Sequence, residues 1–158
     1  MKAYDGDCSV LMASGCIHSI DRRQPRRFAV HLVGDLGLTE AMDLMRQVLA
    51  QVDEIGDEAR VVLDMTALQG CTTAARKQLV LMQRGLARRG CRTAYVSDRP
   101  RFRGMGLWLC HHADDVNGRA FYTMDQADAW LATGRQDEQA CALPLRCVVG
   151  QDPGAVEP

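Results

Sequence analysis

The stretch VVLDMTALQGCTTAARKQL, which runs from Val61 to Leu79, decides how this chain folds. Its apolar start ends in Asp64 and predicts a buried β-strand. Gly70 then supplies a turn residue, and Thr72 and Thr73 supply two hydroxyl side chains that favour a helix N-cap. Unpaired backbone N–H groups and the helix dipole make such a helix start attractive to a phosphate or a partner's carboxylate.

The hydrophobic pattern on either side of this stretch alternates between strands and helices. Pro25 and the charges around it predict a turn that joins the first two strands as a hairpin. The segment 98–112 contains apolar residues, but Gly104 and Gly106 weaken a helical pattern there. The predicted strands cover residues 16–21, 27–33, 60–65, 93–97 and 119–123, and the predicted helices cover 39–56, 74–89 and 125–134.

This order predicts an α/β domain. Strands that alternate with helices form a mostly parallel central sheet, and the hairpin adds an antiparallel N-terminal edge. About four helices should cover that sheet. In the first helix, Thr39 is the expected cap and Met42 an expected core residue, and Asp125 is the expected cap of the last helix.

Length and composition are those of one domain. The chain has 158 residues, of which 47% are hydrophobic, enough for one sizeable core. No apolar run reaches membrane-spanning length and no signal peptide is evident, so we expect a cytoplasmic, bacterial-type protein. Seven cysteines at irregular spacings favour reduced thiols over disulfides. Residues 1–14 are expected to be an N-terminal extension, 15–134 the domain, and 135–158 a polar, flexible tail.

Charge is strongly segregated along the sequence. Residues 35–64 carry eight acidic and two basic side chains, whereas 65–103 carry nine basic and one acidic. Two interpretations are equally open: the acidic helix pairs with the basic one, or the basic face binds an acidic protein partner. Nucleic acid is a less favoured partner because the overall balance is slightly acidic, aromatic residues are few and no recognition motif is present.

Three segments together resemble the STAS domain, and within it the SpoIIAA-like branch named after the anti-sigma factor antagonist. They are the stretch quoted above, TAYVSDRPRFRG from Thr93 to Gly104, and AFYTMDQADAWL from Ala120 to Leu131. The resemblance covers about residues 15–133. It implies a non-catalytic regulatory module that binds a protein partner. Related folds of the CRAL-TRIO group bind lipids, and fold does not fix function.

The resemblance also implies a modification site. In the anti-sigma factor antagonists the turn after the central strand reads Asp-Ser-Ser-Gly, and its phosphorylated serine falls on Thr73 here. The aspartate of that motif falls on Thr72, so it is missing. Thr73 is therefore the candidate phosphoacceptor, and a phosphate there would add roughly two negative charges at a helix start. The simpler interpretation is that Thr72 or Thr73 only caps the helix.

Other reactive residues give weaker patterns. Cys110, His111 and His112 could join Cys141 and Cys147 around a metal, but adjacent side chains on a helix diverge and no C-x-x-C spacing is present. We therefore predict no metal and no cofactor.

Cysteine and histidine chemistry gives no better candidate for catalysis. Cys71 lies beside a helix start, where it is either a reactive thiol or a small core side chain. No histidine lies in a signature near a nucleophile, which leaves Asp64 or Cys71 as the only route to an enzyme.

The sequence thus predicts a protein-interaction module, with no catalytic residues. The alternative is a carrier or sensor of a small apolar or lipid-like ligand, held between the sheet and residues 102–109, with Gly104 and Gly106 as the hinges of a lid. The predicted partner-binding residues are Gly70, Cys71, Thr72, Thr73, Arg76, Lys77 and Arg84.

Overall fold

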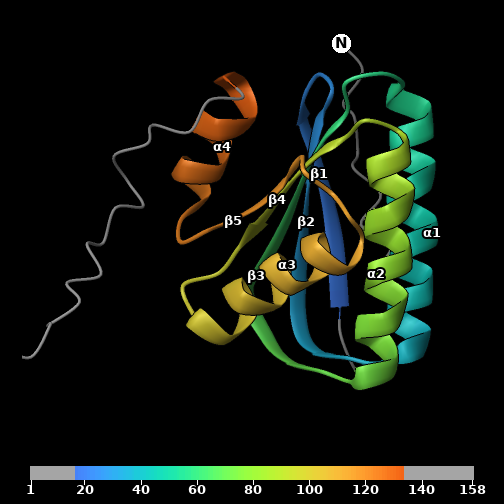
Figure 1. Cartoon of the computed structure of the whole chain (residues 1–158), viewed down its shortest axis with the longest axis vertical. Coiled ribbons are helices and arrows are strands. Elements are labelled where there is room, and N and C mark those ends of the chain that lie inside the picture. The colour runs from blue at the N-terminus through green and yellow to red at the C-terminus, as the bar shows by residue number, and fades with distance from the viewer. Residues whose placement is uncertain (1–16, 134–158) are drawn as a thin grey trace, which may run out of the picture.

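The computed structural model of the chain describes residues 17–133, and these form a five-stranded sheet covered by four helices (Figure 1). The expected N-terminal extension at 1–14 and polar tail at 135–158 lie outside the described residues. The strands are β1 (Ile17–Gln24), β2 (Arg27–Leu36), β3 (Arg60–Cys71), β4 (Arg92–Val96) and β5 (Gly118–Phe121). The helices are α1 (Leu38–Ile55), α2 (Thr73–Arg88), α3 (Pro100–His112) and α4 (Met124–Thr133).

The strands lie in the sheet in the order in which they occur in the chain. β1 pairs antiparallel with β2, and the pairs β2–β3, β3–β4 and β4–β5 are all parallel. The predicted mostly parallel sheet with an antiparallel N-terminal hairpin is therefore confirmed.

Two separate cores lie on the two faces of the sheet. Side chains alternate along β2, so Phe28, Val30 and Leu32 pack beneath α1, α2 and α3, whereas Ala29 points to the opposite face. Among the described residues, only α4 covers the sheet on that second face, through Ala127, Trp130 and Leu131 (Figure 1). No described helix covers the half of this face that belongs to β1 and β2, called the open face below, and Val33 is 46% exposed there.

β3 is longer than the sequence pattern indicates. The prediction ended this strand at residue 65, but β3 continues beside β2 as far as Cys71. β4 leaves it at the Asp64–Val96 pair, so the last part of β3 has a strand on one side only. On the other side, Nη2 of Arg99 donates hydrogen bonds to the carbonyl oxygens of Thr66 and Leu68.

The segment after β4 is a helix despite its two glycines, and its packing on the sheet counts against the alternative of a ligand carrier with a glycine-hinged lid. Pro100 occupies the first turn of α3, where its missing N–H costs nothing. Gly106 permits the close approach of α3 to the sheet, because a Cβ there would lie 2.7 Å from Cβ of Tyr95. Phe102 and Leu109 are buried on the same side, so α3 lies directly on the sheet and leaves no space for a ligand beneath it.

Two helix starts also differ from the predictions. α1 begins at Leu38 after Gly37, so Thr39 lies inside the helix. At the start of α4, Oγ1 of Thr123 accepts a hydrogen bond from the backbone N–H of Gln126, 3.3 Å away, while Asp125 lies in the first turn. In α1 the buried side chains are Ala41, Leu44, Val48 and Val52, whereas Met42 is 51% exposed.

Candidate partner-binding surface

Thr72 and Thr73 lie where the sequence placed them, exposed at the start of α2 directly after β3. Thr72 is the cap: its Oγ1 accepts a hydrogen bond from the backbone N–H of Ala75 at 3.1 Å. Its own N–H donates to the carbonyl oxygen of Leu36, at 3.0 Å, which ties the helix start to the end of β2. Thr73 is the first helical residue, and its hydroxyl has no hydrogen-bond partner among residues 17–133. The two hydroxyls thus differ, because only that of Thr72 is bound to the helix backbone.

Gly70 and Cys71 belong to the end of β3, so the predicted turn is shorter than expected. Gly70 lies against the side chain of Asp35, which would have to move to make room for a Cβ at that position. The carboxylates of Asp35 and Glu40 border an open hollow of about 430 Å³ that Cys71 and Thr72 also line. One flank of the helix start is therefore acidic.

Cys71 is not an activated thiol. Burial raises its pKa, and the nearby guanidinium groups of Arg76 and Arg101 offset only part of that rise. The side chain packs against the larger core cluster, and its thiol donates a weak hydrogen bond to the carbonyl oxygen of Thr72, 3.7 Å away. The interpretation of Cys71 as a small core side chain is therefore the one the geometry supports.

The basic residues of α2 divide into two groups. Lys77, Arg84 and Arg88 repeat at intervals of seven and four, so they share one exposed face. Arg84 donates a hydrogen bond to the carbonyl oxygen of His112, whereas Lys77 and Arg88 form no hydrogen bond or ion pair within the described part of the chain. Arg76 is partly buried and faces α3 instead.

Pairing between the acidic and basic helices is limited to one contact. α1 and α2 pack side by side, and Arg89 binds Asp53 through two hydrogen bonds of 2.7 and 3.2 Å. This contact lowers the pKa of Asp53, chiefly through the hydrogen bond from Arg89. None of the three predicted basic residues, Arg76, Lys77 and Arg84, takes part in an ion pair in residues 17–133, and neither does Arg88.

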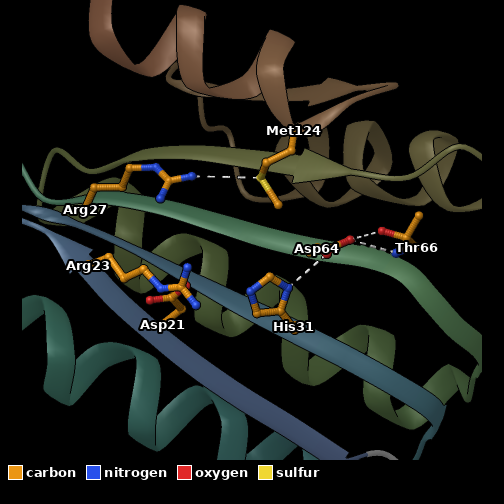
Figure 2. A network of polar contacts seen from close by, with 7 residues as sticks. All are labelled: Asp21, Arg23, Arg27, His31, Asp64, Thr66 and Met124. Carbon is orange, nitrogen blue, oxygen red and sulfur yellow. Dashed lines mark hydrogen bonds and ion pairs between the residues drawn. The ribbon is translucent and has the colours of Figure 1, made fainter.

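A polar network that the sequence did not predict lies on the open face of the sheet (Figure 2). Nδ1 of His31 lies 2.9 Å from Oδ2 of Asp64, and Thr66 donates both its backbone N–H and its hydroxyl to Oδ1. Burial raises the pKa of Asp64, but the hydrogen bonds from Thr66 and His31 outweigh it and leave this pKa lowered. Figure 2 places the His31 ring between Asp64 and the ion pair of Asp21 with Arg23. Only the register of β2 on β3 brings His31 and Asp64 together.

The expected candidates for metal binding or catalysis do not assemble into a site. Cys110 is buried, which raises its pKa to about 12, while His111 and His112 are exposed. Cys141 and Cys147 lie outside the described residues, and within 17–133 no group of three ligand side chains could hold a metal ion. Asp64 lies on the open face and Cys71 packs against the opposite core, so they cannot act together. None of the four helices described is both long and apolar enough to cross a membrane.

Comparison with known proteins gives relatives in structure only. No protein-family profile matches the chain. No curated protein matches it either. Several solved structures resemble it, including the following three. An uncharacterised protein of the DUF3478 family from Shewanella loihica, with a SpoIIAA-like fold, is 17% identical at a TM-score of 0.57, with 76% of this chain and 98% of that chain covered. An anti-sigma factor antagonist from Mycobacterium paratuberculosis is 16% identical at a TM-score of 0.58, with 77% of this chain and 99% of that chain covered. The anti-sigma factor antagonist SpoIIAA in its unphosphorylated form is 9% identical at a TM-score of 0.57, with 75% of this chain and 99% of that chain covered.

The described residues have a SpoIIAA-like fold of the STAS type. The resemblance found in the sequence is thereby confirmed for the fold. At identities of 9 to 17% it extends no further, and the partner and the roles of the site residues rest on the chemistry of the surface itself.

Proposed function

We propose that this chain is a non-catalytic regulatory module that binds an acidic protein partner through the end of β3 and the start of α2. The contact comprises the predicted residues at 70–73, Lys77 and Arg84, and continues along α2 to Arg88, with the predicted Arg76 at its edge toward α3. The observation that carries the proposal is the exposed basic face of α2, on which Lys77 and Arg88 have no partner within residues 17–133.

The charges around the helix start give the contact a direction. Asp35 and Glu40 lie on one flank of Thr72, whereas Lys77, Arg84 and Arg88 lie along α2. An acidic surface is repelled from the first flank and attracted to the second, so it should approach along α2 rather than over the hollow beside α1. Complementary charge of this kind mainly accelerates association and selects the partner.

The likeness of the fold to two anti-sigma factor antagonists supports a regulatory role. Thr73 supplies the means of regulation. Its hydroxyl is exposed and unbonded, and Arg76 and Lys77 follow it by three and four residues, on the helix positions nearest to it. A phosphate on Thr73 would neutralise these cations and repel a carboxylate on the partner.

Charge reversal on α2 tests the proposed contact. A partner is first identified by affinity capture on the immobilised chain and is then titrated against the wild type and the K77E/R88E variant. Association of the variant should slow by about tenfold at low salt and lose most of its salt dependence. The melting temperature should hardly change, because exposed charges contribute little to folding.

The control is R23E/R26E, which makes the same change of net charge on the hairpin between β1 and β2. If both variants weaken binding equally, the partner responds to net charge and the contact on α2 is wrong. If K77E/R88E leaves association unchanged, the face is only a solvated surface.

A second pair of variants tests the role of Thr73. T73E carries a negative charge, and T73Q has nearly the same shape without it. Binding should weaken with T73E and remain near the wild-type value with T73Q, because only the former opposes an acidic partner. Phosphopeptide mapping of the protein from its native cell then shows whether Thr73 carries phosphate. Equal binding by all three proteins would remove Thr73 from the contact.

A further inference from the structure

A second hollow opens on the outer side of α3, where it meets the start of α2. Its volume is about 240 Å³, and it is lined by Arg76, Arg101, Phe102, Gly104, Met105 and Trp108. It differs from the ligand space expected between α3 and the sheet, which the packing of Gly106 on Tyr95 fills.

Two cations line this hollow, Arg76 from α2 and Arg101 from α3. No carboxylate of residues 17–133 forms an ion pair with either arginine. Nε of Arg76 is also buried without a hydrogen-bond partner in this part of the chain. Two unpaired guanidinium groups repel each other, and an anion between them would relieve that repulsion.

The rest of the lining is apolar and largely aromatic. The guanidinium of Arg101 lies over the ring of Phe102, 5.1 Å from the ring centroid. Trp108, which also lines the hollow, is 40% exposed. Gly104 leaves the space open, since a Cβ at that position would have no heavy atom within 4 Å. Aromatic rings and a thioether favour a flat apolar group, which bare phosphate does not have.

We propose that this hollow binds a small aromatic carboxylate. Its ring lies against Trp108 and Met105, and its carboxylate accepts hydrogen bonds from Arg76 and Arg101. A volume of about 240 Å³ has room for a single ring with a short acidic side chain. The inference does not depend on the proposed protein contact, because it concerns the isolated chain.

Phenylacetate is a suitable probe, and phenylacetamide is its neutral counterpart of the same shape. The chain has two tryptophans, so the indole N–H region of its NMR spectrum contains two signals. Trp108 lines the hollow, whereas Trp130 packs between α4 and the other face of the sheet and serves as an internal reference. Phenylacetate should shift the Trp108 signal saturably, with a Kd on the order of 1 mM for so few atoms, and leave Trp130 unchanged. Phenylacetamide should bind at least about tenfold more weakly.

Substitutions of single arginines test which of them bind the carboxylate of phenylacetate. R76Q and R101Q should each weaken the binding of phenylacetate by about tenfold. R88Q, which makes the same change elsewhere on α2, should leave the affinity for phenylacetate unaltered. Equal affinity for acid and amide, or equal loss with R88Q, would overturn the proposal. So would the absence of a saturable shift at about 20 mM, far above the expected Kd. No partner is present in these titrations, so their failure would leave the protein contact on α2 untouched.

Discussion

Two glycines of α3 provide a matched test of how this helix lies on the sheet. Both are in the helix interior, where replacing glycine by alanine contributes about 1 kcal/mol to stability through backbone entropy and helix propensity. At Gly104 the new Cβ would meet no atom within 4 Å, so G104A should raise the free energy of unfolding by about 0.5 to 1 kcal/mol.

At Gly106 the same gain is opposed by a collision. The added Cβ would lie 2.7 Å from Cβ and 2.9 Å from Cγ of Tyr95, a fully buried side chain that cannot rotate away. α3 must then move outward by several tenths of an ångström, and such overpacking costs about 1 to 3 kcal/mol. G106A should therefore be neutral to destabilising by about 2 kcal/mol, and should lie about 1 to 3 kcal/mol below G104A.

Urea denaturation of both variants measures this difference directly, with an unchanged m-value as the sign that both still unfold from the same compact state. The reasoning depends on contact between Gly106 and Tyr95. If G106A stabilises the chain as much as G104A does, α3 does not lie on the sheet in the way described, and the outer hollow would have to be placed anew.

Three further outcomes follow from the site. T72A should lower the free energy of unfolding by about 1 kcal/mol through loss of the cap, whereas T73A should change it by less than about 0.5 kcal/mol; the reverse order in urea denaturation would move the cap to Thr73. The pKa of Asp64 is lower in the folded state than in the unfolded chain, so its contribution to stability is present above about pH 4 and is lost on further acidification. The difference in free energy of unfolding between wild type and D64N should therefore shrink below about pH 4, and parallel pH curves of the two proteins would contradict this. Cys71 should react with iodoacetamide at pH 7 more slowly than a free cysteine, as followed by peptide mass spectrometry, and a faster reaction would revive the activated thiol.

Strongly periodic segments were predictable from the sequence. The buried side of α2 includes Ala75, Leu79, Met82 and Leu86, whose spacing of three or four residues in the sequence already defines one apolar face. α3 was harder to predict, since Gly106 appears unfavourable for a helix when considered alone. Its favourable contribution comes from Tyr95, which the sequence does not show to be a neighbour.

The candidate site was predictable in part for a similar reason. Local pattern placed Thr72 and Thr73 at an exposed helix start, since caps depend only on nearby residues. It also assigned Arg76 and Lys77 to one face, although consecutive helix positions differ by about 100° and α3 covers only the side of Arg76. The contact of His31 with Asp64 depends on strand order and register, which periodicity alone cannot provide.

Arg99 has a consequence for the exposed edge of β3. It is the residue from which α3 starts, and its guanidinium takes the place of a neighbouring strand along the unpaired part of β3. That part of β3 leads directly to Thr72 and α2. The guanidinium of Arg99 therefore ties the start of α3 to the part of β3 that leads into α2. It also covers a strand edge with which a strand of another chain could otherwise pair.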